Sequence, residues 1–365
     1  MQSRLQVFHA VVAHLQQLVP SLSITQARGI SLLVLGAIWA EHVSLRKMAA
    51  ALPLSAHPAS TERRLRRWLD SERLPTTTLW SAMRRTMVSA TIPQELRVVF
   101  DLTPLRGQYH LLCLGLVQGR RALPLAWRLQ PLHTPWEQPL ADLLAELIAQ
   151  VQADLPADCT VTMLADRGLV GPGVVDACTN VGWHLVLRLK AGDTSRVRHP
   201  DGSEEPLAAL VARAPRRWTG AVDVFKQAGW RSGYLTIYQG AGHSEAWVLF
   251  STRPAGLARV RDYRTRMRIE ATFQDLKGRG FQLDRSRLGT RERLERLCLV
   301  VSLALWWLHG LGEAAVKHGK RTDWDRPSGP TMSRLRLGWC YVHWCEHRHR
   351  VPPLPFRTLP MERTT

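Results

Sequence analysis

The sequence predicts an α/β protein, in which a mixed sheet with flanking helices is interrupted by a β-rich insertion and preceded by an all-helical domain. Three observations support this fold class. Residues 1–92 carry apolar side chains at helical spacing, and nothing there alternates like a strand. From about residue 96, strand-like runs begin to alternate with helical patterns. Residues 191–255 instead have turn residues between short β-like runs.

The helical domain is expected to consist of short helices separated by Pro, Ser and Thr, near residues 3–18, 24–41, 44–52, 59–72 and 76–89. In the fourth helix, Ser60 can act as the N-cap. The same helix carries Arg63, Arg64 and Arg67. A bundle of short helices with one arginine-rich member is typical of small DNA-binding domains. The alternative is a helical platform whose arginines face water.

The next part of the chain has the pattern of a mixed sheet. Residues 93–190 begin with LRVVFDLTPL and with HLLCLGLVQGRRALPLAWRLQ, where QGRR marks the turn between two strands. A helix near 138–153, the strand TVTMLADRG, a helix near 171–181 and the strand WHLVLRLK follow. We expect this core to resume at 256–318, after the insertion at 191–255, and a basic, partly loose tail at 319–365.

The net charge limits the kinds of partner. The chain has 365 residues, with 49 Lys and Arg against 30 Asp and Glu, and a formal charge of +19. A folded chain this basic usually binds a polyanion, most often nucleic acid. Anionic membrane is the rival partner, but the runs ISLLVLGAIWA and LCLVVSLALWWL are too short to span a bilayer and are expected to be buried helices. No cleavage site follows the N-terminal helix, so we expect a cytoplasmic protein.

The six cysteines are scattered, which favours reduced thiols over a disulfide framework. One segment, CYVHWCEHRHR, brings Cys340, Cys345, His347 and His349 close together in sequence. The spacing matches no standard zinc finger, and a single short segment would have to supply every ligand. We therefore favour a basic, aromatic tail over a structural zinc site.

Two aspartates stand where predicted core strands end. Asp101 follows VVF, and Asp166 follows TMLA and precedes Gly168. The ends of neighbouring core strands meet at one edge of a sheet, where open α/β sheets place their ligands. Glu270, on a helix packed against the sheet, can join them. Three clustered carboxylates repel one another unless hard cations neutralise them, and magnesium is the natural ion. Taken singly, each Asp is a common turn or cap residue.

The helix that carries Glu270 lies in the stretch YRTRMRIEATFQDLKGRG, residues 263–280. A rotation of about 100° per residue places Tyr263, Arg266, Glu270 and Lys277 on one narrow face. An apolar stripe adjoins this face and can dock on a core. The face is interpreted either as a salt-bridged surface cluster or as a metal-binding carboxylate beside a phosphate clamp. Two metal ions at such a site, about 3.5–4 Å apart, suit phosphoryl transfer.

These motifs together resemble the DDE transposases of the insertion-sequence-4 family. The resemblance rests on FDLT around Asp101, on ADRGL around Asp166 and above all on the fixed spacing Tyr-x2-Arg-x3-Glu-x6-Lys at residues 263–277. It covers roughly residues 95–310. Over the N-terminal 90 residues it is weaker and rests on a basic helical segment in the expected place.

The resemblance implies a ribonuclease-H-like catalytic core in which Asp101, Asp166 and Glu270 bind two Mg²⁺ ions, with Mn²⁺ as a possible substitute. It also implies that Tyr263, Arg266 and Lys277 contact DNA phosphates near the cleaved end. Two further residues extend the expected DNA site. Trp247 can stack on an extruded base, although packing within a strand is an equal alternative, and Arg188 is a candidate backbone contact.

The resemblance implies a bacterial cut-and-paste transposase that binds the terminal inverted repeats of its element and joins them to target DNA. A dimer that bridges two ends is expected as well. Two other functions stay open. One is a structure-specific nuclease of the same fold, and the other is a DNA-binding regulator that has lost the chemistry.

Overall fold

The computed structural model describes residues 2–89, 95–192, 195–240, 245–328 and 331–354. The chain divides into two compact units. The first, here called the helical unit, contains residues 1–92, 104–109 and 272–365, and the second, the sheet unit, contains residues 93–103 and 110–271. The predicted domain limit near residue 92 and the last part of the predicted tail, 355–365, lie outside the described residues.

The helical unit begins with five helices that lie within two residues of the predicted ones: α1 Gln2–Leu18, α2 Ile24–Ala40, α3 Leu45–Ala51, α4 Pro58–Asp70 and α5 Thr76–Ser89. The predicted cap of the fourth helix is wrong. Helix α4 begins earlier, at Pro58, and the N-cap is His57, whose side chain accepts a hydrogen bond from the Ala59 amide. Proline favours the first helical position because its φ is already helical and it has no amide hydrogen to satisfy.

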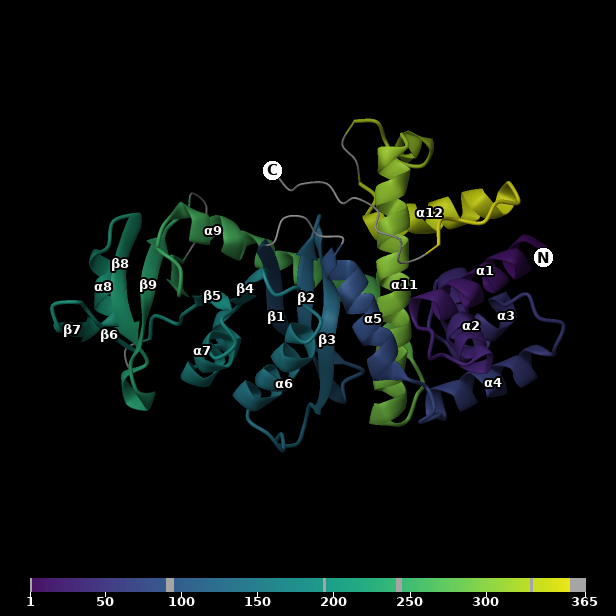
Figure 1. Ribbon diagram of the computed structural model, residues 1–365. Helices are drawn as coiled ribbons and strands as arrows, with labels where there is room; N and C mark the ends of the chain where they lie inside the picture. Colours follow the sequence, from purple (N-terminus) through teal and green to yellow (C-terminus); the bar gives the residue numbers. More distant parts are fainter. Residues whose placement is uncertain (1, 90–94, 193–194, 241–244, 329–330, 355–365) are drawn as a thin grey trace. The chain divides into compact units, whose positions relative to one another are not determined.

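Two C-terminal helices complete the helical unit: α11 Arg291–Lys317 and α12 Arg334–His347 (Figure 1). They test two expectations, of which the buried helix is confirmed and the loose tail is corrected. Helix α11 extends well beyond its apolar run and is long and apolar enough to cross a membrane, yet 83% of its most apolar window is buried, as expected for a core helix. The predicted tail is not loose at 334–347, because Trp339 of α12 is buried and its indole donates to the Ile38 carbonyl of α2 at 3.0 Å.

Helices α11 and α12 approach each other closely because glycines lie where they meet. A Cβ atom added to Gly338 of α12 would lie 2.0 Å from the Leu308 carbonyl oxygen of α11. A Cβ atom on Gly312 of α11 would lie 2.0 Å from the Arg334 carbonyl oxygen of α12. Real Cβ atoms do not come this close to backbone atoms, so this packing requires glycine at both positions.

The sheet unit is built on one mixed sheet. The described residues form ten strands: β1 Glu95–Leu105, β2 Tyr109–Gln118, β3 Arg121–Pro131, β4 Thr160–Ala165, β5 His184–Arg188, β6 Arg196–Arg198, β7 Glu204–Pro206, β8 Arg217–Val224, β9 Arg231–Tyr238 and β10 Trp247–Ser251. Their order across the sheet is β3-β2-β1-β4-β5-β10-β9-β8-β6-β7. Strands β1, β4 and β5 are parallel, and β10, β9, β8, β6 and β7 continue the sheet in antiparallel pairs. This α/β architecture agrees with the predicted fold class.

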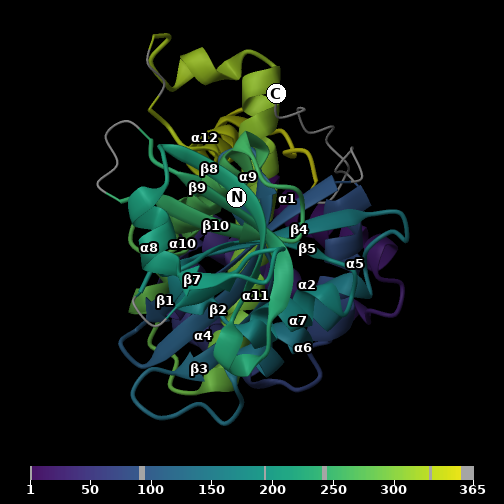
Figure 2. The same ribbon diagram turned by 90° about the vertical axis from the view of Figure 1, so that its left-hand side faces the viewer.

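Five helices accompany the strands in the chain: α6 Leu140–Gln152, α7 Pro172–Thr179, α8 Leu207–Arg213, α9 Leu257–Arg264 and α10 Arg268–Leu276. Strand register shows which face α7 and α9 cover. Met163 of β4 contacts Cys178 of α7, with 3.5 Å between the sulfur atoms. On the other face, Arg97 of β1 is aligned with Thr162 of β4 and forms an ion pair with Asp262 of α9. Figure 2 shows the same arrangement, with α6 and α7 below the central strands and α9 above them.

The close approach of α11 and α12 leads to a stability prediction. Gly338→Ala is expected to lower the free energy of unfolding by about 1–3 kcal/mol, because the new methyl group overlaps backbone atoms that have little room to move. Urea unfolding followed by far-UV circular dichroism measures the change. The control is Gly289→Ala, where no atom lies within 4 Å of the added Cβ. Equal stability of the two variants would contradict this view of the helix contact.

A second prediction concerns His343 of α12. Contacts with Glu346, at 3.5 Å, and with Glu41, at 3.1 Å, raise the pKa of His343 to about 9. A raised histidine pKa stabilises the fold fully below about pH 6.5, and this contribution disappears as the pH rises through about 9. The imidazole is partly exposed, so we expect a loss of only ~1 kcal/mol between these limits.

Thermal unfolding of the wild type and of His343→Gln across pH 6–10 tests this prediction. The difference between the two proteins should shrink as the pH rises, because only the wild type has a charged imidazole at position 343 to lose there. A difference that stays constant across the range would show that the His343 contacts do not act through ionisation.

Candidate active site

Two of the three predicted acids lie side by side on neighbouring parallel strands, but Asp101 lies within β1, which continues to Leu105, and only Asp166 follows the end of its strand, β4. The aligned pairs of β1 and β4 end at Phe100 with Ala165, so Asp101 and Asp166 are the next residues along the chain after this pair. Both follow the alternation that places Arg97 and Thr162 on the α9 face of the sheet. The sequence prediction that these two aspartates meet at one edge agrees with this register.

The third acid comes from a helical segment that differs from the predicted one. Instead of one continuous helix, α9 and α10 are joined by a 3-10 turn at Thr265–Met267. Tyr263 belongs to α9, Arg266 to the turn and Glu270 to the first turn of α10. Their spacing still brings the three side chains to the same sheet edge, because a 3-10 turn changes the helical rotation only locally.

The guanidinium of Arg266 brings the three carboxylates together. Its Nη1 donates to Asp101 Oδ2 at 2.8 Å, and its Nη2 donates to Glu270 Oε1 at 2.9 Å. The same Nη2 lies 3.8 Å from Asp166 Oδ2. Arg266 is only 6% exposed. The structure therefore places this residue, expected to contact DNA phosphates, among the acids, with little of its surface open to solvent.

The site shifts the ionisation of its members in different directions. Burial raises the pKa of Asp101, and the charges of Asp166 and Glu270 add to the rise, whereas Arg266 opposes it. Burial acts in the same direction on Asp166, but the Tyr263 hydrogen bond and other favourable contacts outweigh it and lower the pKa of that carboxyl. Asp166 is thus held as the carboxylate, and Asp101 depends more strongly on a nearby cation.

Tyr263 and Trp247 form an aromatic wall beside Asp166. The Tyr263 hydroxyl donates to Asp166 Oδ1 at 2.7 Å. Burial, followed by this hydrogen bond, raises the pKa of Tyr263, so the phenol remains a donor. The Trp247 ring of β10 packs edge-on against the Tyr263 ring, with 5.1 Å between centroids. The prediction that Trp247 stacks on a base stays open, and in this structure its partner is Tyr263.

Arg188 extends the site along the sheet. In the register of β4 and β5, Ala165 is aligned with Leu187, so Arg188 is the neighbour of Asp166. Its Nη2 lies 3.1 Å from Glu245 Oε2, and Arg167 reaches the same oxygen at 3.0 Å. Sequence reasoning did not single out Arg167 or Glu245. The position of Arg167 directly after a strand-end aspartate was a signal that could have identified it.

The remaining predicted DNA contacts belong to the helical unit. Lys277 directly follows α10 and donates to the Pro104 carbonyl, and burial lowers its pKa. Arg63, Arg64 and Arg67 are exposed on α4.

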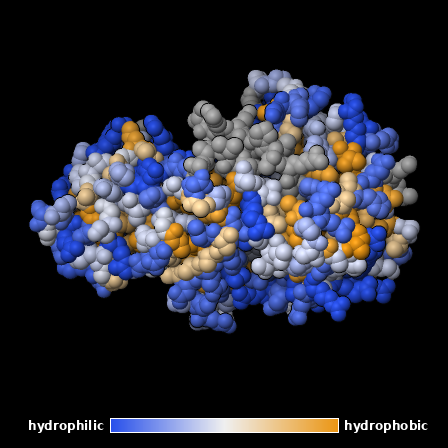
Figure 3. Space-filling view, viewed as in Figure 1, coloured by the Kyte–Doolittle hydropathy of each residue, from blue (hydrophilic) through white to orange (hydrophobic). Residues whose placement is uncertain are grey.

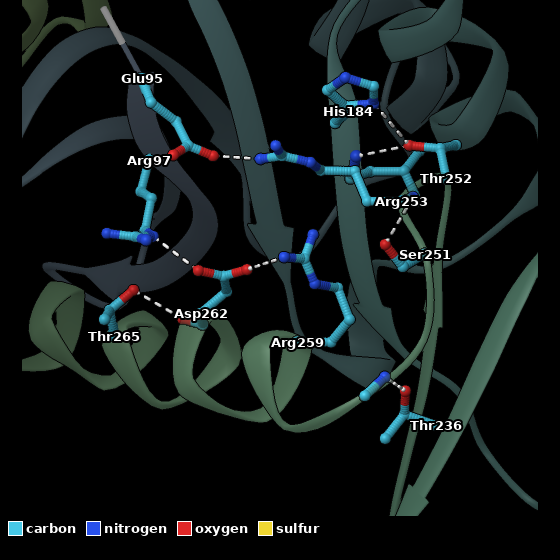
Figure 4. Close-up of polar contacts among 12 residues, drawn as sticks. Glu95, Arg97, His184, Thr236, Ser251, Thr252, Arg253, Arg259, Asp262 and Thr265 are labelled. Carbon is cyan, nitrogen blue, oxygen red and sulfur yellow. Dashed lines mark hydrogen bonds and ion pairs between the residues drawn. The ribbon is translucent and has the colours of Figure 1, made fainter. Parts of the chain in front are cut away.

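A polar network fixes α9 on the sheet (Figure 4). Asp262 of α9 accepts from Arg97 Nε at 2.7 Å and lies 3.2 Å from Arg259 Nη2. Close by, Arg253 pairs with Glu95 at the start of β1. Asp262 is 5% exposed, so its ion pairs are screened little by water. The network holds the helix that carries Tyr263 and leads into Arg266.

The residues that the structure describes form no metal-binding cluster as the side chains stand. Within the described parts of the chain, no three His, Cys, Asp or Glu residues are grouped so that they could hold a metal ion. Near the chain end, Cys340 and Cys345 lie on α12, and His347 is its last residue. Among the three predicted acids, the Arg266 guanidinium supplies the positive charge.

Comparison with known families adds one finding. The model described as a transposase DDE domain matches residues 137–307. This segment of the chain is similar to a transposase DDE domain. The matched range includes Asp166, Tyr263, Arg266 and Glu270, whereas Asp101 lies before it. No curated protein matches the chain.

The central position of Arg266 in this DDE-like segment leads to a prediction. Arg266→Gln is expected to lower the free energy of unfolding, measured in EDTA at pH 7.5, by on the order of 3 kcal/mol, because the clustered carboxylates lose their shared cation. Arg264→Gln is the control, since Arg264 is exposed and contacts Tyr238 only through a long hydrogen bond, 3.4 Å, and through the tyrosine ring, 5.8 Å from the ring centroid. Urea unfolding gives both values, and equal stability would show that the acids do not depend on Arg266.

Proposed function

We propose that this protein is a cut-and-paste DNA transposase of the insertion-sequence-4 type, with a ribonuclease-H-like catalytic core. One observation carries the proposal: carboxylates from β1, from the end of β4 and from α10 converge on one buried guanidinium. The three acids are distant from one another in sequence. An ordinary surface salt bridge needs only one carboxylate for each guanidinium, so the meeting of three points to a further role. The DDE-domain match over residues 137–307 supports the same conclusion.

The three acids fit a divalent cation by their chemistry. Carboxylate oxygens are the ligands that Mg²⁺ prefers, and Mg²⁺ sites in phosphoryl-transfer enzymes use few protein ligands besides water and phosphate. We assign Asp101, Asp166 and Glu270 as the residues that hold Mg²⁺, with Mn²⁺ as a substitute and two ions per site. Bound there, the ions would activate the attacking hydroxyl or water and stabilise the leaving oxygen.

The neighbouring side chains have supporting roles in this proposal. Tyr263 holds the Asp166 carboxylate in place through its hydroxyl. Arg266 offsets part of the charge of the acids before a cation binds, and its guanidinium then becomes available to a DNA phosphate. Arg188 and Lys277 provide further phosphate contacts, and Trp247 offers an aromatic surface to an extruded base.

The reaction also defines the partners in this proposal. The substrates are the terminal inverted repeats of the element and a target DNA. A homodimer bridges the two ends, and the protein acts in the bacterial cytoplasm at the nucleoid. Arg63, Arg64 and Arg67 on α4 add positive charge for DNA binding outside the site of chemistry.

Cleavage and joining assays test the proposed function. With Mg²⁺, the wild type should cut DNA that carries the inverted repeats flanking its gene and join the ends to a plasmid. Asp101→Asn and Glu270→Gln are expected to lower both rates by about 100-fold or more, because even outer partners of metal sites contribute 10–100-fold. Both variants should still bind end DNA. Asp142→Asn, an exposed acid on α6, is the control.

Each other outcome identifies a different function. Mg²⁺-dependent nicks without joined products would replace the transposase with a nuclease of the same fold. End binding without any cutting by the wild type would indicate a regulator. Full cutting by either acid variant would reject the site assignment.

A further inference from the structure

A groove of about 730 Å³ lies in the helical unit, and none of its lining residues is one of the three acids of the sheet unit. Basic residues line it from three segments: Arg46 and Lys47 of α3, Arg66 of α4, and Arg285 and Arg287, which precede α11. We call these five residues the basic groove. The segment with Arg285 and Arg287 follows the other two by more than two hundred positions in sequence, so local spacing gives no sign that it meets them.

The basic groove has little charge compensation. Glu62 lies 3.2 Å from Arg66. Within the described residues, Arg46, Lys47, Arg285 and Arg287 form no ion pair with a carboxylate, and Arg285 donates only to the Gln282 side chain, at 3.3 Å. These four cations are all exposed. They are therefore available to an anionic partner.

The effect of these charges extends to a buried neighbour. His42, which also lines the groove, is 7% exposed. Burial lowers its pKa, and the charges of Lys47 and Arg285 lower it further, while Asp284 opposes them. Cations from α3 and from the 285–287 segment thus act on the same imidazole, which supports a shared positive field in the groove.

One backbone hydrogen bond joins the two walls, and two further contacts hold each wall in place. The Val43 amide, in the link between α2 and α3, donates to the Phe281 carbonyl at 3.0 Å. Arg106 donates to the Leu288 carbonyl at the other end of the 281–288 segment. The Ser44 amide donates to His42 Nδ1 at 2.9 Å. These contacts hold the cationic side chains on a preorganised frame, which lowers the entropy lost when a ligand binds.

We propose that the basic groove binds the sugar–phosphate backbone of duplex DNA. Duplex DNA carries one negative charge per roughly 1.7 Å of its axis, so several cations on one surface can contact it at once. The apolar groove residues Val43, Leu45 and Leu288 are at most 6% exposed and offer little to an apolar ligand. Hydrophilic residues also cover the surface over α4, where Arg63, Arg64 and Arg67 are exposed (Figure 3).

The choice of DNA as the occupant rests on the proposed function, but the basic groove is a different site from the one formed by the three acids. Contacts with phosphates position a duplex without reading its sequence. The basic groove should therefore contribute equally to end DNA and to unrelated DNA of the same length. It would add a binding surface to the helical unit that does not depend on Mg²⁺.

Binding measurements in EDTA test this inference without any cleavage. Fluorescence anisotropy with a 30-base-pair duplex, over a range of salt concentrations, compares the wild type with two double variants, Arg285→Gln/Arg287→Gln and Arg46→Gln/Lys47→Gln. Each pair is expected to weaken binding about 10-fold or more and to reduce the slope of log K against log salt by about 1.8, or 0.9 per lost phosphate contact. Arg28→Gln/Lys317→Gln is the control, because both residues are exposed and lie outside the groove.

Several outcomes would overturn the inference. One is an unchanged slope for both groove variants, and another is an equal change in the control. Groove-dependent preference for an RNA duplex of the same length would also overturn it. Circular dichroism and melting temperature show whether the variants fold. The two double variants lie on different segments, so the test still stands if one of them does not fold.

The two proposals fail separately. Loss of DNA affinity in the groove variants with no cutting by the wild type would keep the groove and reject the transposase. If the wild type joins DNA ends with Mg²⁺ but the groove variants bind DNA as tightly as it does, the transposase is kept and the groove is rejected.

Discussion

The ion pairs of Arg266 with three carboxylates are the interaction on which the site depends. Asp101 is largely buried, and burial makes its ionised form costly. Carboxylates this close repel one another, and one guanidinium offsets only part of that repulsion. With all three acids ionised, the formal charge is +1 − 3 = −2. A divalent cation would balance this charge, which is the physical reason that the arrangement suits a metal-dependent reaction.

Both sides of α9 contribute to this geometry. One side directs Tyr263 toward Asp166, while the other is held to the sheet by the ion pair of Asp262 with Arg97 of β1, and Arg259 of the same helix also contacts Asp262. The 3-10 turn that follows α9 carries Arg266. A loop could not hold a guanidinium against three acids as accurately, because positions on packed helices and strands move less. The buried network is thus part of the site even though it contacts none of the three acids.

Much of the fold and part of the candidate site could be predicted from the sequence, because they depend on local periodicity. Helical spacing predicted α1 to α5, and strand-end positions predicted that Asp101 and Asp166 are neighbours. Other features depend on contacts that no local pattern encodes. Periodicity gives the direction of the Arg266 side chain around a helix, but it does not show that the three acids lie in that direction. The basic groove was missed for the same reason, since the 281–288 segment meets α3 only through tertiary packing.

The charges of the protein must serve two opposite requirements. A chain of formal charge +19 attracts a polyanion, but a local charge of −2 repels the phosphate that must enter the site. Arg188 and Arg167 beside Asp166 reduce this repulsion, and both are already engaged with Glu245. A cation held by the acids would reduce it much further. For the proposed reaction, metal ion and DNA therefore strengthen each other's binding, because each removes an electrostatic cost that the other would meet, and this coupling is reciprocal.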